Sequence, residues 1–257
     1  MIVVTRISIA PVKALGLTFP DQVRLDAHGA AGDRRFWLTD AAGRLYNNKR
    51  NGPFALVRPT WDEDRRQLSL ALPGGQVASG TVELGTETAT TLYGDPFPSR
   101  RVVGPWEEAL SEFAGEPLLL FHAPDGATDR GLHGGNTSLV SRASLARVGE
   151  IARAGGPLDG RRFRMLFEVD GIEAHEEDDW IGRRVQIGEA GILFHGDIGR
   201  CVVTSQSPDT GVVDVDTLGA LASYRREGHT EPLPLGIYGQ VIEPGIVRVG
   251  DAVTVAR

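Results

Sequence analysis

The chain has 257 residues, of which 41% are hydrophobic and 24% charged, and its formal net charge at pH 7 is −7. This composition fits one large globular domain or two small ones, and it disfavours general nucleic-acid binding, which requires a basic face. The single cysteine excludes an internal disulfide, and no apolar run approaches the roughly 18 residues that span a bilayer. The N-terminus lacks a basic region followed by a long apolar one, so we expect a cytoplasmic protein without membrane attachment.

The N-terminal part of the chain has the pattern of short strands separated by turns. Ile2–Ile9 is rich in β-branched residues and ends before Pro11, which predicts a strand stopped by proline. Residues 33–47 predict a hairpin, and a polar loop over residues 47–53 follows it. Regularly spaced strands of this kind are typical of a small barrel or sandwich.

The C-terminal part adds helices to the same pattern. The spacing of apolar residues predicts helices over 105–114, 143–154 and 217–226. Thr137–Ser141 predicts a short strand, and Ser141 is the N-cap candidate for the helix that follows.

We therefore predict a mainly β protein with a few short helices, built from two associated β-barrel-like domains. The 33 glycines and 15 prolines favour many turns over long helices. The proline-rich break at residues 93–98 is the strongest candidate for a boundary. It divides the chain into an N-terminal barrel domain, residues 1–98, and a second domain, residues 99–257.

The only cysteine, Cys201, stands at the end of a predicted strand and directly after Arg200. The segment Pro208-Asp-Thr-Gly211 predicts a turn shortly after it. A free cysteine is often a small buried hydrophobe, but a nearby arginine favours the thiolate, which attacks electrophiles, carries sulfane sulfur or binds a soft metal. Neighbouring side chains on a strand point to opposite faces, so the pair can act together only where the backbone is irregular.

The histidines supply no evident partner for this thiol. None of the six lies in a local signature of a Cys-His nucleophile, and their spacings do not match a zinc site. His133, in a glycine-rich stretch, is the histidine that we expect to face a ligand. The acidic run over residues 173–179 predicts an exposed loop.

Basic side chains would form an anion site if the fold brought them together. Lys13, Arg34, Lys49 and Arg164 stand at predicted strand ends or in the loops beside them, Arg164 where basic and apolar residues alternate. Arginine suits bidentate phosphate binding, and lysine acts as a point charge. Each of these basic residues, taken alone, is best interpreted as a solvent-exposed surface residue. If all four converged, they would form a pocket for a phosphorylated cofactor.

Several segments occur together in a telling order: Ile9-Ala-Pro-Val-Lys13, Asp33-Arg34-Arg35-Phe-Trp-Leu38, Ser138-Leu-Val-Ser141, Phe163-Arg164, Arg200-Cys-Val-Val-Thr204, Pro208-Asp-Thr-Gly211 and Gly245-Ile-Val-Arg-Val-Gly-Asp251. Together they resemble the MOSC family, named for the molybdenum-cofactor sulfurase C-terminal domain, preceded by its N-terminal β-barrel domain. Within that family they are most similar to the amidoxime reducing components. The resemblance covers nearly the whole chain, and its most specific part is the Arg-Cys-x-x-Thr and Pro-Asp-Thr-Gly pair.

The resemblance implies a molybdenum cofactor, molybdenum bound to molybdopterin, with Cys201 as metal ligand and catalytic residue. The residues that it implies for holding the cofactor are Lys13, Arg34, Arg35, Lys49, Thr137, Ser138, Arg164 and Arg200. It also implies reduction of N-hydroxylated or N-oxygenated small molecules. The sequence has no cysteine cluster for an iron–sulfur centre, so electrons are expected from a separate ferredoxin, flavoprotein or cytochrome b5-like protein.

This chain departs from the family pattern at three places close to the implied site. Ala14 stands where relatives usually carry serine, Met165-Leu166 where they often have Pro-Asn, and Ser207 where an acid is common. These changes remove polar contacts around the cofactor and leave the substrate open.

Two further functions fit the same residues. Cys201 could carry a persulfide and deliver sulfur to an acceptor with no metal, as a sulfurtransferase does. Alternatively, the protein could be a non-catalytic barrel that binds a pterin or an anion, with a structural cysteine. Cyanolysis and the rate of Cys201 alkylation distinguish these two from the redox enzyme.

Overall fold

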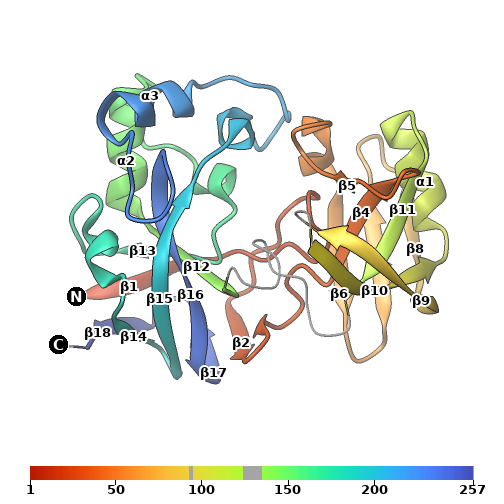
Figure 1. The fold of residues 1–257 in the computed structure, drawn as a ribbon, viewed down its shortest axis with the longest axis horizontal. Coiled ribbons are helices and arrows are strands. Elements are labelled where there is room, and N and C mark those ends of the chain that lie inside the picture. The colour runs from red at the N-terminus through yellow and green to blue at the C-terminus, as the bar shows by residue number, and fades with distance from the viewer. Residues whose placement is uncertain (93–94, 124–134, 257) are drawn as a thin grey trace.

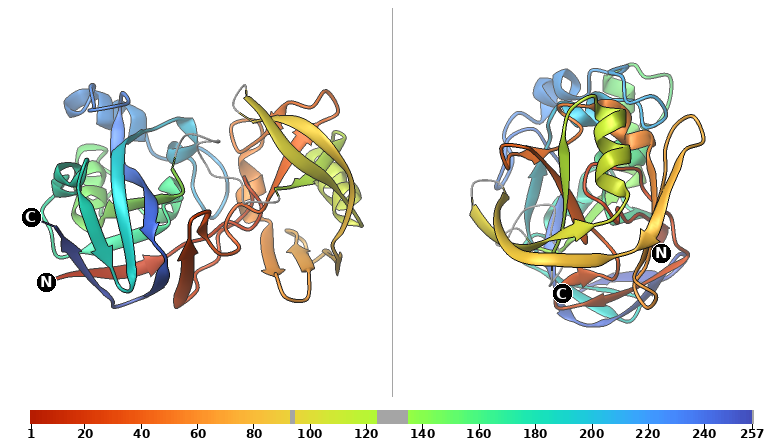
Figure 2. Two further views of the ribbon diagram at one scale, coloured as in Figure 1. Left: turned by 60° about the horizontal axis from the view of Figure 1, so that its bottom comes forward. Right: turned by 90° about the vertical axis from the view of Figure 1, so that its right-hand side faces the viewer.

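In the computed structural model, which describes residues 1–92, 95–123 and 135–256, the chain forms two lobes (Figures 1 and 2). The first lobe is a closed barrel with the strand order β1-β13-β12-β16-β15-β14-β18. Its strands are β1 (Ile2–Ile7), β12 (Thr137–Ser141), β13 (Phe167–Asp170), β14 (Arg184–Ile187), β15 (Ala190–Gly199), β16 (Pro234–Glu243) and β18 (Ala252–Val255). The helices α2 (Arg142–Ile151) and α3 (Thr217–Tyr224) belong to the same lobe.

The second lobe combines a five-stranded sheet, in the order β5-β4-β11-β10-β9, with the three-stranded sheet β6-β7-β8. These strands are β4 (Phe36–Asp40), β5 (Leu45–Tyr46), β6 (Arg58–Asp62), β7 (Gln67–Ala71), β8 (Val77–Thr81), β9 (Glu83–Leu92), β10 (Asp95–Val103) and β11 (Leu118–His122). Helix α1 (Trp106–Ala114) packs against it, and a small sheet of β17 (Gly245–Arg248), β2 (Gln22–Asp26) and β3 (Gly29–Ala30) pairs the two ends of the chain. The predicted fold class, mainly β with a few short helices and barrel-like domains, is confirmed. None of the helices in the described residues is long and apolar enough to cross a membrane.

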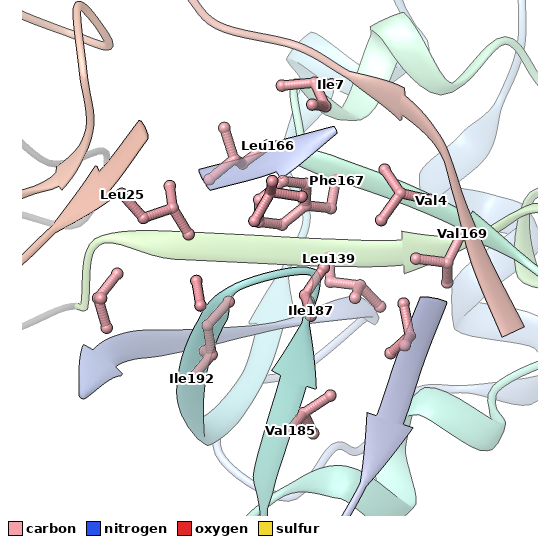
Figure 3. Packing of buried hydrophobic residues seen from close by; sticks show 14 of the residues in the cluster. Val4, Ile7, Leu25, Leu139, Leu166, Phe167, Val169, Val185, Ile187 and Ile192 are labelled. Carbon is pink, nitrogen blue, oxygen red and sulfur yellow. The ribbon is translucent and has the colours of Figure 1, made fainter. Parts of the chain in front are cut away.

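The barrel is held by an apolar interior to which every barrel strand contributes. Val4 and Ile7 of β1, Leu139 of β12 and Phe167 of β13 point inward and pack on one another (Figure 3). All four are at most 1% exposed, and burying a side chain of this size contributes about 1.5–3 kcal/mol. The alternation of inward and outward residues along the strands therefore follows the period-2 pattern of the sequence.

Strand pairing does not follow the predicted boundary between residues 98 and 99. β1 belongs to the barrel, whereas β10 and β11 pair within the sheet of the other lobe. β2 and β3 still contribute Val23, Leu25 and Ala30 to the barrel core, so the chain passes to the other lobe before β4 and returns between β11 and β12. Long-range strand pairing, such as that of β1 with β13, determines which lobe a strand joins, and local sequence patterns do not reveal such pairing.

Residues 95–98 of the proline-rich stretch belong to β10, which pairs with β9. β10 pairs with β9 along its whole length but with β11 only at Arg100 and Arg101. Pro96 and Pro98 therefore stand where β10 pairs with β9 and with no other described strand. Because they are two residues apart, their missing N–H groups face the same side of the strand, and proline is tolerated where that side is the unpaired one.

The acidic run 173–179 is not the exposed loop that its composition predicts. Residues Glu176–Trp180 form a 3₁₀ turn in which Glu177 is 0% exposed. Glu177 accepts hydrogen bonds from Ser141 N at 3.1 Å and Ser141 Oγ at 2.9 Å, beside the N-terminus of α2. Burial raises the pKa of the Glu177 carboxyl, and hydrogen bonds from the serines oppose that shift. Ser141 is the N-cap predicted from sequence, since its Oγ accepts from Ser144 N at 3.0 Å.

His175, next to this turn, predicts a pH-dependent loss of stability. Burial, then the nearby Arg225 and Arg147, lower its pKa to about 4. Between pH 6.5 and 4 the His175 ring is protonated in the unfolded chain but stays neutral in the folded chain. The free energy of unfolding therefore falls as pH falls through this window. Because the ring is partly exposed, we expect well under the limit of about 1.4 kcal/mol per pH unit.

The check is urea unfolding of the wild type and His175→Asn between pH 7 and pH 4.5. Asparagine tolerates the left-handed backbone of this residue (φ 68°) and does not titrate. The His175→Asn variant should lose less stability than the wild type on acidification. The control His195→Asn, at an exposed histidine, should lose as much stability as the wild type. Parallel curves for the wild type and His175→Asn would show that His175 is not responsible.

The two lobes meet where the polar loop 47–53 touches the Pro-Asp-Thr-Gly turn. A Cβ added to Gly211 would lie 2.3 Å from the backbone of Gly52, so the two glycines abut through their main chains. Gln206 Nε2 donates to Asn48 O at 2.9 Å in the same region, and Figure 1 shows the segment after β15 reaching toward the other lobe. The contact fixes the loop that carries Lys49 against the segment that carries Cys201.

Gly211→Ala should therefore cost more stability than its backbone conformation alone explains. Gly211 has φ 72° and Gly43 has φ 76°, but nothing lies within 4 Å of a Cβ at Gly43. Gly43→Ala thus reports the conformational penalty alone. We expect Gly211→Ala to lower the free energy of unfolding by about 1–3 kcal/mol more than Gly43→Ala, because it forces the lobes apart. Equal losses in denaturant titrations would contradict the proposed contact.

Candidate functional site

A cavity of about 500 Å³ lies between the lobes and is lined by segments from both. All but one of the site residues predicted from sequence line it. These residues are Lys13, Arg34, Lys49, Thr137, Ser138, Arg164, Arg200 and Cys201. Residues far apart in the chain thus converge on one volume.

Cys201 stands two residues after the end of β15. The strand ends at Gly199, and Cys201 is the N-cap of the 3₁₀ turn Val202–Ser205. Thr204 fastens this turn, since its N and its Oγ1 both donate to Cys201 O, at 3.0 and 2.9 Å. The cysteine is partly exposed, so its thiol is open to the cavity and not sealed in the core.

Arg200 is fixed beside the cysteine by main-chain carbonyls. Its Nε donates to Leu235 O at 2.9 Å and its Nη1 to Phe163 O at 3.2 Å, and the guanidinium lies 5.4 Å from the centre of the Phe163 ring. The regular ladder between β15 and β16 shifts register between Asp197 and Gly199. Arg200 and Cys201 stand after this shift and outside β15, so the alternation of a regular strand does not send their side chains to opposite faces.

Further buried cations join the lobes across the cavity. Lys13 is 5% exposed and Arg34 is 4% exposed. Arg34 forms an ion pair with Asp33, and its Nη2 donates to Arg164 O at 2.9 Å, while Arg164 Nη2 donates to Leu15 O at 2.8 Å. These cations are therefore held in place by the fold itself.

Strained backbone conformations occur among the residues that line the cavity. Ala14, Arg34 and Arg164 have φ values of 79°, 48° and 55°. Side-chain-bearing residues rarely adopt such values, which cost about 1–3 kcal/mol each and concentrate at functional sites. Arg164 follows the 3₁₀ turn Gly160–Phe163, so its segment is not a strand of alternating residues, and β13 begins only at Phe167.

Arg35 is the predicted site residue that lies elsewhere. Its guanidinium is 3.2 Å from Glu63, and it lines a smaller neighbouring cavity of about 210 Å³. Arg34 stands in a turn with a left-handed backbone and pairs with Asp33, whereas Arg35, which directly follows it, pairs with Glu63, so the two consecutive arginines have different partners. His133 lies outside the described residues.

Several residues that line the cavity were not predicted from the sequence. Asn48 is 4% exposed and donates from Nδ2 to Ala14 O at 2.7 Å, which ties the polar loop to the residue after Lys13. Arg162 lines the cavity but is held by Asp214 through two hydrogen bonds, at 2.6 and 2.8 Å. Glu231 and Tyr238 come from the segment before and along β16, and only the register of that strand brings them here.

The lining fits an anionic, polar ligand. Its basic residues (Lys13, Arg34, Lys49, Arg162, Arg164 and Arg200) outnumber its carboxylates, Asp33 and Glu231. In addition, Thr137 Oγ1 is buried in the lining and has no hydrogen-bond partner among the described residues. An orphaned buried hydroxyl is costly, and a polar group of a ligand would satisfy it. Phosphate and pterin edges supply such groups, and the Cys201 thiol is a soft metal ligand, so the donor set suits a metal–pterin cofactor.

Comparison with known proteins agrees with this arrangement. Residues 1–101 match the model of the MOSC N-terminal beta barrel domain, and residues 129–254 match that of the MOSC domain. Among curated proteins, mitochondrial amidoxime reducing component 2 of Rattus norvegicus is 35% identical over 122 residues, covering 45% of this chain and 35% of that protein. Mitochondrial amidoxime-reducing component 1 of Homo sapiens is 32% identical over 122 residues, with the same shares of 45% and 35%.

The matched part thus spans only about a third of the length of these relatives. Among solved structures, the YUAD protein from Bacillus subtilis aligns over 99% of this chain and 96% of its own, with 13% identity and a TM-score of 0.48. The two domain models together match most of the chain, on both sides of the cavity. The chain belongs to the MOSC family, with a MOSC N-terminal β-barrel domain followed by a MOSC domain.

Proposed function

We propose that this protein is a molybdenum-cofactor-dependent oxidoreductase that reduces N-hydroxylated or other N-oxygenated compounds. The observation that carries the proposal is the convergence, in one cavity between the lobes, of the only cysteine and a set of fixed cations. The names of the curated relatives, amidoxime reducing components, support the class of substrate. Their limited coverage leaves the reaction itself to be tested.

Each lining residue has a role in this proposal. The Cys201 thiolate would ligate the metal, and Lys13, Arg34, Arg164 and Arg200 would hold the phosphate and polar edges of the pterin, with Lys49 at the more exposed side. Thr137 would give its unpartnered hydroxyl to the cofactor. Ser138 is less free to do so, because its Oγ already accepts from Leu166 N at 2.9 Å.

The bound cofactor would supply two-electron redox chemistry at the N–O bond. The balance is R–NH–OH + 2 H⁺ + 2 e⁻ → R–NH₂ + H₂O, so one nitrogen–oxygen bond breaks and the oxygen leaves as water. The role of the chain is to orient the substrate against the metal and to exclude competing reactions. The electrons would come from a separate ferredoxin, flavoprotein or cytochrome b5-like protein.

The test is a turnover assay on protein made in a host that synthesises the cofactor. Benzamidoxime is supplied as substrate and a dithionite-reduced viologen dye as electron donor, and benzamidine is measured by chromatography. We expect benzamidine from this protein and none from protein made in a cofactor-deficient host. Protein that carries molybdenum and pterin yet reduces none of a panel of amidoximes, hydroxylamines and N-oxides would contradict the proposed reaction.

A second candidate is sulfur transfer by a Cys201 persulfide. It is favoured by the partly exposed thiol among fixed cations, which would stabilise a persulfide anion. Incubation with a sulfur donor should then add the mass of one sulfur atom, and cyanide should release thiocyanate. An unchanged intact mass would remove this candidate.

A further inference from the structure

The backbone just before Cys201 is held by a loop, residues 226–233, that joins α3 to β16. Glu231 Oε2 accepts a hydrogen bond from Gly199 N at 2.9 Å. Leu233 O accepts one from Arg200 N at 3.1 Å. The two amides that precede the cysteine are therefore both bonded to this loop.

Gly199 needs the side chain of Glu231 as an acceptor. The β15–β16 ladder shifts register between Asp197 and Gly199, so regular strand pairing is interrupted at this point. A poorly solvated amide that loses its partner costs about as much as a lost hydrogen bond. A Cβ on Gly199 would lie 2.8 Å from Glu231 Oε2, so the approach of the carboxylate requires glycine here.

Glu231 is in turn held by a buried aspartate. Asp197 is 0% exposed, and its Oδ1 accepts from Thr230 N at 3.0 Å, Glu231 N at 2.9 Å and Thr230 Oγ1 at 2.7 Å. A carboxylate at this depth is tolerated when several donors satisfy it. The loop therefore has a fixed conformation, in which Glu231 reaches Gly199 and also lines the cavity with Cys201.

We propose that Glu231 is a positioning residue for Cys201, since its carboxylate fixes the backbone of Gly199, two residues before the cysteine, and with it the place of the thiol in the cavity. The contribution of Glu231 is the hydrogen bond. The inference rests on the proposed function only in taking Cys201 as the reacting residue, and it holds equally for metal ligation and for a persulfide.

The test compares Glu231→Ala with Glu231→Gln in the full chain without cofactor. The measured quantity is the rate at which N-ethylmaleimide modifies Cys201 at neutral pH, followed by intact mass. Glu231→Ala removes the acceptor and loosens the segment, so we expect modification about fivefold or more faster than in the wild type. Glu231→Gln keeps an oxygen that accepts from Gly199 N, so its rate should stay within about twofold of the wild type.

Matched variants separate this effect from general loss of stability. Glu189→Ala, at an exposed glutamate paired with Arg248, should leave the rate unchanged. Thr230→Val weakens the same loop at Asp197 and should accelerate modification less than Glu231→Ala does. The proposal is overturned if Glu231→Ala reacts at the wild-type rate, if Glu231→Gln reacts like Glu231→Ala, or if the rates follow the thermal unfolding midpoints alone. Because the reaction needs no molybdenum, a failed turnover assay would leave this result standing.

Discussion

Replacing Cys201 with serine is expected to abolish reduction of N-hydroxylated substrates while leaving the fold intact. Serine has nearly the shape of cysteine, but its hydroxyl does not ionise at neutral pH and is a poor ligand for a soft metal site. Loss of an outer-shell partner of a metal typically costs 10–100-fold, and we expect loss of the ligand itself to exceed about 100-fold in turnover. The measurement is benzamidoxime reduction with a chemical electron donor, normalised to protein.

The control for this variant is Val202→Thr at the next residue. Val202 is 41% exposed and is not among the residues that line the cavity, so its substitution should change neither turnover nor thermal stability. Thr204 bonds Cys201 through the main-chain carbonyl of the cysteine, which serine retains, so the 3₁₀ turn should persist. Turnover by Cys201→Ser close to that of the wild type would show that the thiol is not at the reaction centre.

Replacing Lys13 with methionine should release the cofactor. Methionine has a similar length and fills the same buried position, but it offers no charge to a phosphate. A hydrogen bond to a charged group contributes about 1.5–3 kcal/mol, so the affinity for the pterin should fall by about 10–100-fold. The expected result is protein that purifies with much less phosphopterin than the wild type, measured by fluorescence after oxidation.

Arg35→Gln is the matched control for removal of a cation. Arg35 is next to Arg34 in sequence but lies against Glu63 outside the cavity, so its loss should leave the pterin content unchanged. The resemblance to the family alone assigns Arg34 and Arg35 together, whereas the structure distinguishes them. Equal pterin losses for Lys13→Met and Arg35→Gln would indicate a general effect of net charge and would contradict a specific phosphate site.

Local patterns in the sequence were sufficient for several elements and for the cysteine and most of the basic residues of the candidate site, whereas Thr137 and Ser138 were assigned only through the resemblance to the MOSC family. The hairpin over 33–47 appears as β4 and β5, and the helix predicted over 143–154 is α2 with Ser141 as its cap. These features depend on neighbouring residues, whose periodicity and capping chemistry are visible in the chain. Cys201 stood out because it is the only cysteine, and its placement after β15 follows from the strand pattern.

Other features depended on contacts between distant segments and could not be found this way. The membership of β1 in the barrel requires pairing with β13, which lies more than half the chain away. The boundary placed at residues 93–98 treated Pro96 and Pro98 as breakers, although a strand with one open side accommodates both. The sequence pattern placed Glu177 in a solvent-exposed acidic run. Only the 3₁₀ turn, which buries it, shows that it accepts a hydrogen bond from Ser141.

The most direct test of the central claim is metal and pterin analysis of the wild-type protein, purified from a host that makes the molybdenum cofactor. The cavity, its cations and Cys201 predict molybdenum and phosphopterin in equal amounts, both retained through gel filtration. Lys13→Met prepared in parallel should carry much less of each. Wild-type protein that is folded and free of both molybdenum and pterin would contradict the account.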